Sequence, residues 1–318
     1  MEYTDSSANS EYSTAIICAL PIEAKAGQAI FDETFHSEGP HTLSIQESKS
    51  DICSYTAGRI GPHKVLLIHI PGMGRVNAAS FGHSSLSSIK KIQLALLATQ
   101  YTGGFVSKHN RDDSLGRPRP ETKGFIAKLE AGKQCLQART ASHLAASFHG
   151  LVYPGAENDK LFSADYLHKH RGQGLECDCR HGDHSCEIAK GTSCQVLGCH
   201  PVHPLSRERH EETNTQPPLP IIQIGSIASS DTVIKLASHR DAIAAAEGII
   251  AFEMESAGIW DCLPSLVIRG VSDYADSHKN KYWQEYAAAT AAACAKAVLK
   301  SWNTTGTPRK AYAQQQNT

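Results

Sequence analysis

The chain has 318 residues, of which 41% are hydrophobic, and its formal net charge at pH 7 is -1. A chain of this length and hydrophobic content can bury a large core, so we expect one large α/β domain. The near-zero net charge argues against a nucleic-acid polymer as the partner, because nucleic-acid-binding surfaces are strongly basic.

The first residues, 1–13, are polar and acidic and lack the basic start and apolar core of a secretory signal. No apolar run reaches the length that spans a bilayer. We therefore expect a cytoplasmic protein that makes no membrane contact. The ordered domain is predicted at 14–303, between disordered tails at 1–13 and 304–318.

Apolar, β-branched-rich runs alternate with helical segments along the domain. In chain order, the sequence predicts a strand at 14–20, a helix from Pro21 to Phe31, strands at 64–70 and 94–98, and a helical region at 125–146. It then predicts a strand at 221–228, a helix at 232–246, strands at 249–252 and 266–268 with a helix at 255–262 between them, and a long helix at 282–302. The strand, helix, strand pattern over 249–268 predicts two parallel strands joined by a right-handed crossover.

Acidic side chains follow three of these strands where each strand ends. Glu23 lies in the first helical turn after the first strand, where a carboxylate ordinarily complements the helix dipole. Glu253 and Glu255 leave the next-to-last strand, and Asp273 follows the last strand. Because ligands of open α/β sheets bind outside the carboxyl ends of strands, we expect carboxylates from two strands to meet at one pocket. Residues two apart on a helix point about 200° apart, so we assign Glu255 rather than Glu253 to face a ligand.

A glycine-bearing turn follows the strand at 64–70. Gly72 and Gly74 flank Met73, and Arg75 follows them at the start of a segment of small residues. Backbone amides at such a turn suit an anion or a hydroxyl-rich sugar. Asn77 occupies the position of the third glycine, so the dinucleotide-binding fingerprint is incomplete.

Residues from about 172 to 220 are polar and rich in cysteine and histidine, and we interpret this segment as a loop insertion. Its candidate metal ligands are Cys177, Cys179, His184 and Cys186. Thiolate and imidazole ligands at this density could hold a structural zinc ion. The alternative is an exposed insertion with free thiols, which the irregular spacing and the lack of Cys-x-x-Cys pairs favour.

Four motifs of the chain resemble the nucleoside phosphorylase and nucleosidase superfamily and, within it, the fungal nucleoside-phosphorylase-like domains. They are Ala19-Leu20-Pro21-Ile22-Glu23, Gly72-Met73-Gly74, Glu253-Met254-Glu255 and Arg269-Gly270-Val271-Ser272-Asp273. The resemblance covers about residues 14–302. It implies a single domain built as a three-layer α/β sandwich around a twisted mixed β-sheet. It also implies a site at the strand ends, where the N-glycosidic bond of a nucleoside is cut by water or phosphate.

The resemblance implies a role for each residue at a motif position. Asp273 would protonate N7 of a purine, and Ser272 would place its carboxyl group. Met254 would pack against the ribose, Glu255 would accept hydrogen bonds from the ribose hydroxyls, and Glu23 would activate the attacking water. This division of roles suits an oxocarbenium-like transition state, which needs a proton donor for the leaving base and an acceptor for the water. The resemblance implies further substrate-binding residues at Gly74, Arg75 and Val233.

Three functions follow from these motifs, and hydrolysis by a purine nucleosidase is favoured. Leu97-Ala98-Thr99 carries no positive charge where related phosphorylases place an arginine, and Glu23 would repel phosphate. Phosphorolysis stays open, because Arg75 could bind phosphate. A third alternative is a nucleoside-binding or signalling module with impaired catalysis, because the segment after Gly104 lacks a strand that is central in the superfamily.

The chemistry requires no cofactor, and zinc would be structural only. The predicted partner is a small-molecule nucleoside or nucleotide. A homodimer is a further implication of the resemblance.

Overall fold

The computed structural model describes residues 12, 14–35, 53–72, 94–98, 120–171, 177, 179, 181–182, 184–199, 218–229, 232–260, 263 and 265–302. Tyr12, in the tail predicted to be disordered, is half-buried against the core beside β1 (Thr14–Cys18). The predictions for the rest of both tails, for Gly74 and Arg75, for the turn at 99–104, for the segment 105–119 and for 200–217 lie outside the described residues. Within them, no helix is both long enough and apolar enough to cross a membrane.

The architecture is built on a six-stranded mixed sheet with the order β2-β3-β4-β1-β5-β8. These strands are β1 (Thr14–Cys18), β2 (Glu33–Phe35), β3 (Ser54–Ile60), β4 (His63–His69), β5 (Leu94–Ala98) and β8 (Ser265–Ile268). β1 pairs in parallel with β4 and β5, and β5 pairs in parallel with β8. The β2–β3 and β3–β4 pairs are antiparallel. A separate parallel pair is formed by β6 (Ser226–Ser229) and β7 (Ile249–Glu253).

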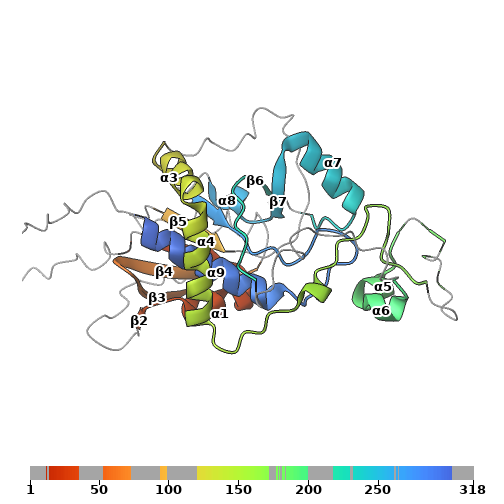
Figure 1. The fold of residues 1–318 in the computed structure, drawn as a ribbon, viewed down its shortest axis with the longest axis horizontal. Coiled ribbons are helices and arrows are strands. Elements are labelled where there is room, and N and C mark those ends of the chain that lie inside the picture. The colour runs from red at the N-terminus through yellow and green to blue at the C-terminus, as the bar shows by residue number, and fades with distance from the viewer. Residues whose placement is uncertain are drawn as a thin grey trace, which may run out of the picture.

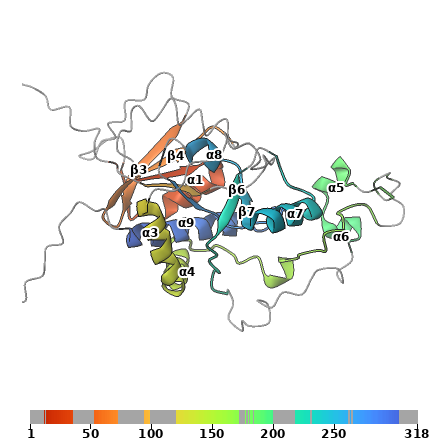
Figure 2. The same cartoon turned by 90° about the horizontal axis from the view of Figure 1, so that it is seen from above.

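The helices are α1 (Pro21–Ala29), α3 (Pro120–Ala131), α4 (Lys133–Ser147), α5 (Glu187–Gly191), α6 (Cys194–Leu197), α7 (Ala237–Glu247), α8 (Ser256–Trp260) and α9 (Gln284–Ser301), with a 3-10 turn η4 at Ala156–Asn158. α1, α4 and α9 lie on one face of the large sheet, and α8 lies on the other (Figures 1 and 2). The described residues thus form the three layers that the sequence resemblance predicts.

The central strand β1 shows why the sheet is covered on both faces. All five of its residues are buried. Ile16 and Cys18 contribute to the core beneath α1 and α9, whereas Ala15 and Ile17 contribute to the opposite core, which includes Ile259 of α8. Alternate residues of a strand point to opposite faces, so a continuous apolar run requires a helical layer on each side.

Helix α9 approaches the sheet closely because its buried face is almost entirely alanine. The same closeness constrains the chain that leaves β8. A Cβ atom on Gly270 would lie 2.0 Å from the carbonyl oxygen of Ala287. Glycine at this position therefore allows the segment that carries Arg269 and Asp273 to run directly against α9.

The predicted pairing of the last two strands is wrong. The segments at 249–252 and 266–268 form β7 and β8, but β7 pairs with β6, and β8 pairs with β5 in the large sheet. The apolar runs identify the strands correctly but carry no information on the partner. Tertiary packing decides which strands pair, and here it places β8 beside β5 and β7 beside β6.

Several boundaries also differ from the sequence prediction. No strand was predicted at β2 or β3, whose exposed and polar residues give little apolar alternation. The strand predicted from 221 begins at 226, and the helix predicted from 232 begins at 237. The helical region at 125–146 starts earlier, at Pro120, and is divided at Gly132 into α3 and α4.

Candidate active site

The two carboxylates at the end of β7, Glu253 and Glu255, have different partners. Glu253 accepts hydrogen bonds from the backbone N–H groups of Glu255 (2.9 Å) and Ser256 (2.8 Å) and from the Ser256 hydroxyl. These bonds satisfy free donors at the start of α8, so Glu253 caps that helix. Glu255 is 0% exposed, and its Oε2 atom lies 3.5 Å from Nη1 of Arg269. Glu255 therefore makes an ion pair with the guanidinium, although the charge of Glu253 acts on Arg269 more strongly.

Arg269, the first residue after β8, is a buried cation surrounded by acids. Its side chain is 6% exposed. Burial lowers the pKa of its guanidinium, whereas the charges of Glu253, Glu255, Glu23 and Asp273 all act in the opposite direction. One guanidinium thus lies within electrostatic reach of four carboxyl groups from three parts of the chain. Sequence reasoning quoted Arg269 as part of a motif but gave it no role.

Glu23 lies in the first turn of α1 and is 3% exposed. Its Oε2 atom accepts hydrogen bonds from the backbone N–H groups of Ala19 (3.1 Å) and Leu20 (3.0 Å). The other oxygen, Oε1, is buried and has no hydrogen-bond partner among the described residues. Burial, with a smaller contribution from the charge of Glu255, raises the pKa of the Glu23 carboxyl to about 8, against the opposing effects of the two N–H groups and Arg269.

Asp273 is held at the start of a tight loop. Its Oδ1 atom accepts a hydrogen bond from the backbone N–H of Ala275 (2.9 Å). Its Oδ2 atom lies 3.5 Å from the Ser272 hydroxyl, which donates to it, and 3.8 Å from Nζ of Lys279. Burial raises the pKa of the Asp273 carboxyl. One oxygen therefore fixes the loop, while the other faces Ser272 as the sequence analysis expects.

The loop that begins at Asp273 is anchored from several sides. Ala275 has a φ of 51°, in the left-handed region that non-glycine residues rarely adopt. A guanidinium N–H of Arg240 on α7 donates to the Tyr274 carbonyl (2.7 Å), and the Tyr274 hydroxyl donates to Asp159. The backbone N–H of His168 donates to the Ser277 hydroxyl (2.9 Å). These contacts maintain a backbone conformation that the loop would not adopt in isolation.

The other predicted site residues differ in what surrounds them. Met254 is buried directly beside Glu255, and Val233 is half-buried before α7. The Ser229 hydroxyl at the end of β6 accepts a hydrogen bond from the backbone N–H of Ala257 (3.2 Å), which joins that strand to α8.

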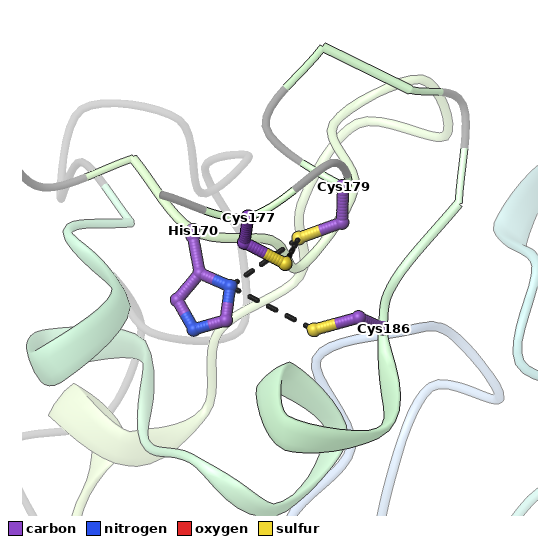
Figure 3. A group of neighbouring side chains, drawn as sticks. All are labelled: His170, Cys177, Cys179 and Cys186. Carbon is purple, nitrogen blue, oxygen red and sulfur yellow. Dashed lines mark hydrogen bonds between the residues drawn. The ribbon is translucent and has the colours of Figure 1, made fainter. Parts of the chain in front are cut away.

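Three of the four predicted metal ligands come together. Cys177, Cys179 and Cys186 gather around a ring nitrogen of His170, whereas His184 is not a member of this group (Figure 3). His170 precedes the segment that the sequence analysis treated as the insertion. The predicted ligand set begins at Cys177 and therefore does not include His170.

The arrangement offers acid and base chemistry in a low-dielectric setting. Burial raises the pKa of both the Glu23 and the Asp273 carboxyl groups, so each holds its proton to higher pH than an exposed carboxyl group, and Glu23, with a pKa of about 8, exchanges its proton near neutral pH. The excess of carboxyl groups over cations also favours a ligand that develops positive charge.

The chain was compared with protein families, with curated proteins and with solved structures. No family model matches the chain. A nucleotide-binding leucine-rich repeat (NLR)-like protein of Hyaloscypha variabilis is 30% identical over an alignment of 327 residues, which covers 91% of this chain and 29% of the relative. The chain thus spans less than a third of the length of that protein.

Among solved structures, similar chains include three hydrolases of nucleoside-type substrates by name. The 5'-methylthioadenosine/S-adenosylhomocysteine nucleosidase of Neisseria meningitidis in complex with methylthio-immucillin-A is 16% identical, with 91% of this chain and 99% of that chain covered and a TM-score of 0.43. The futalosine hydrolase of Helicobacter pylori is 15% identical, with 92% and 98% of the two chains covered and a TM-score of 0.44. The S-adenosylhomocysteine nucleosidase of Streptococcus pyogenes is 18% identical, with 92% and 98% of the two chains covered and a TM-score of 0.44.

Replacing Arg269 by methionine tests whether the guanidinium stabilises the acidic cluster. We expect Arg269→Met to lower the free energy of unfolding by about 3–5 kcal/mol at pH 7, because it leaves buried carboxylates without a cation. The measurement is urea unfolding. The double variant Arg269→Met/Glu255→Gln should recover part of the loss, because it also removes a buried negative charge.

Arg59→Met is the matched control. Arg59 pairs with Glu33 at 3.1 Å, but both side chains are nearly half exposed, so its loss should cost no more than about 1 kcal/mol. Equal losses for Arg59→Met and Arg269→Met would contradict the central role of Arg269.

The raised pKa of Glu23 predicts a pH-dependent difference between the wild type and Glu23→Gln. A carboxyl group with a raised pKa in the folded state binds more protons there than in the unfolded state, so it costs stability as the pH rises from about 4.5 to about 8. The wild type should lose stability relative to Glu23→Gln across this range, by on the order of 4–5 kcal/mol in total. Urea unfolding of both proteins from pH 4.5 to 8.5 measures the difference. A constant difference would show that Glu23 is not perturbed by burial.

Proposed function

We propose that the chain is a nucleosidase of the nucleoside phosphorylase and nucleosidase superfamily, which hydrolyses the N-glycosidic bond of purine nucleosides or related nucleotides. The observation that carries the proposal is the pair formed by Glu23 and Asp273. Both are buried carboxyl groups with raised pKa values, and the charge of Arg269 acts on both.

Asp273 is the proposed acid. Its raised pKa keeps a proton on the carboxyl group to higher pH than in an exposed aspartate, so the proton is available to N7 of a leaving purine. The hydrogen bond from the Ala275 backbone fixes the carboxyl plane, and the Ser272 hydroxyl holds Oδ2. Protonation of the purine makes it a better leaving group as the glycosidic bond breaks.

Glu23 is the proposed base for the attacking water. Two backbone N–H groups hold Oε2, while Oε1 is buried without a partner among the described residues, which supports a water or ligand contact at that oxygen. With a pKa of about 8, roughly a tenth of the Glu23 carboxyl groups would be ionised at pH 7, and the base would gain strength from its poorly solvated site.

Met254 and Glu255 are the proposed ribose contacts. Both are buried and follow β7 directly. Glu255 faces Arg269, so it has a counterion and can accept hydrogen bonds from sugar hydroxyls as a carboxylate. As the bond to the base breaks, the sugar becomes oxocarbenium-like, and neighbouring carboxylates stabilise its positive charge.

The charge balance favours water over phosphate as the acceptor. The charges of Glu253, Glu255, Glu23 and Asp273 all act on Arg269. An attacking phosphate dianion would have to compete with these carboxyl groups for the guanidinium, whereas water would not. Phosphorolysis with Arg75 as the phosphate ligand is the alternative reaction.

A second candidate function is nucleoside binding without turnover in a signalling protein. The similarity to an NLR-like protein, of which this chain spans 29%, supports it. Both candidates use the same residues to hold the nucleoside. They differ in whether Asp273 transfers a proton. The predicted cytoplasmic location and homodimer remain predictions.

The pair Asp273→Asn and Asp276→Asn tests the proposed acid against a purely structural role. The Asp273 side chain is 7% exposed and Asp276 is buried, and each carboxylate accepts a 2.9 Å hydrogen bond from the backbone N–H two residues later, a bond that asparagine retains. We expect Asp273→Asn to slow purine release about 10²–10⁴-fold, because the acid is lost. Asp276→Asn should stay within about tenfold of the wild type.

The measurement is chromatographic detection of free base from adenosine, guanosine, methylthioadenosine and ATP. Near-normal release by Asp273→Asn, or equal losses in both variants, would remove Asp273 from the mechanism. Binding of a nucleoside by the wild type without release of base would instead support the second candidate.

A further inference from the structure

The described part of the chain contains two groups of cysteine and histidine side chains with the geometry of metal centres. The first group consists of His170, Cys177, Cys179 and Cys186, whose ligand atoms all lie within 4.8 Å of one another. Nδ1 of His170 lies 3.3 Å from Sγ of Cys179 and 3.7 Å from Sγ of Cys186, and the Cys177 and Cys179 sulfur atoms are 3.4 Å apart (Figure 3).

These separations match those of ligands around one zinc ion. With bond lengths of about 2.3 Å to sulfur and about 2.0 Å to nitrogen, ligand atoms of a tetrahedral zinc site lie roughly 3.5–3.8 Å apart. Three thiolates and one imidazole form a common structural zinc ligand set. The backbone N–H of Ala189 also donates to Sγ of Cys186 (3.3 Å), a contact that stabilises a ligating thiolate.

The second group joins the same segment to the loop of Asp273. It consists of His168, Cys199 and His278, to which we add Cys194 as a fourth candidate ligand because its sulfur atom lies near His168. A nitrogen or sulfur atom of each of His168, Cys199 and His278 lies within 4.8 Å of the others. Nδ1 of His168 is 3.5 Å from Sγ of Cys199 and 3.6 Å from Sγ of Cys194. Two thiols and two imidazoles again supply four ligands.

The hydrogen bonding of His168 favours metal binding at Nδ1. Its Nε2 atom lies 2.9 Å from the Thr192 carbonyl oxygen, which can only accept. Nε2 must therefore carry the proton, and in the neutral ring Nδ1 then presents a lone pair toward the two sulfur atoms. A ligating histidine typically donates its other N–H to a carbonyl or carboxylate in this way.

The segment that carries both groups has little else to hold it together. Helices α5 and α6 are short and lie apart from the large sheet in both views (Figures 1 and 2). Of their large apolar side chains, Ile188 is 72% exposed and Val196 is 64% exposed, and Leu197 is buried. A segment with so little buried apolar surface gains its folding free energy elsewhere, and metal binding is a common source.

We propose that the chain binds two structural zinc ions. The first zinc centre uses His170, Cys177, Cys179 and Cys186. The second zinc centre uses His168, Cys194, Cys199 and His278. The two ligand sets interleave along the sequence, since His168 and His170 are separated by one residue but serve different ions.

The second zinc centre connects the metal-binding segment to the candidate active site. His278 follows Asp273 by five positions in the same loop, and its ring stacks on Phe162 with a centroid separation of 3.9 Å. The backbone N–H of His168 already donates to Ser277 beside it. The zinc ion would add a bond that fixes this end of the loop.

Metal analysis of the purified full chain by inductively coupled plasma mass spectrometry tests the proposal. We expect two zinc ions per chain in the wild type and one in each of Cys177→Ser and Cys199→Ser. His278→Ala should also retain one ion, whereas His278→Cys, which supplies another ligand, should retain two. Cys135→Ser and His184→Ala are the controls and should retain two, because neither residue belongs to either centre.

Cobalt titration of the metal-free wild type keeps the test independent of the folding of variants. Two equivalents of Co²⁺ should produce tetrahedral thiolate–cobalt absorption, and zinc should displace both. Less than one metal ion per chain, iron in place of zinc, or cysteines recovered as disulfides would overturn the proposal. A single zinc ion that survives Cys199→Ser and His278→Ala would overturn the second centre. Metal content is measured without an assay of nucleoside cleavage. A failure of the zinc proposal can therefore be told apart from a failure of the proposed function.

Discussion

The buried guanidinium of Arg269 is the interaction on which the candidate site depends. Four carboxyl groups from the start of α1, the end of β7 and the loop after β8 lie within its electrostatic reach. Buried acids of this kind destabilise a fold unless a cation or hydrogen bonds compensate them. Arg269 supplies the cation, and backbone N–H groups of α1, α8 and the Asp273 loop supply the hydrogen bonds. Because Gly270 has no side chain, the segment that carries Arg269 can pass directly against the backbone of α9.

Compensation by Arg269, and by Lys279 at 3.8 Å from Asp273, is incomplete, and the proposed chemistry follows from that imbalance. Glu255 lies beside the guanidinium, whereas Glu23 and Asp273 keep raised pKa values because burial outweighs their favourable contacts. A site with surplus carboxyl groups suits a substrate that becomes positively charged and disfavours an attacking anion. The same loop is bounded at its far end by His278, so the proposed second zinc centre and the proposed acid share one short segment.

The sequence predicts where the strands and helices lie better than it predicts which strands pair with each other. Apolar runs locate β1, β4, β5, β7 and β8, and the alanine-rich run locates α9, because these patterns depend on local burial. Strand pairing depends on contacts between distant segments, so the assignment of β7 to β6 was not predictable. The acids at strand ends were identified by position, but Arg269 was not, since a single basic residue after a strand has no distinctive spacing. His168, His170 and His278 were not identified as candidate metal ligands because they lie outside the cysteine-rich run.

The central claim is that the acids around Arg269 cleave a purine nucleoside with water. Its most direct test is identification of the sugar formed from adenosine by the purified wild type, with and without inorganic phosphate, by nuclear magnetic resonance. The account predicts adenine and free ribose in equal amounts, at a rate that phosphate does not increase. Ribose 1-phosphate as the product would contradict hydrolysis, and the absence of base release from adenosine, guanosine, methylthioadenosine and ATP would contradict catalysis at this site.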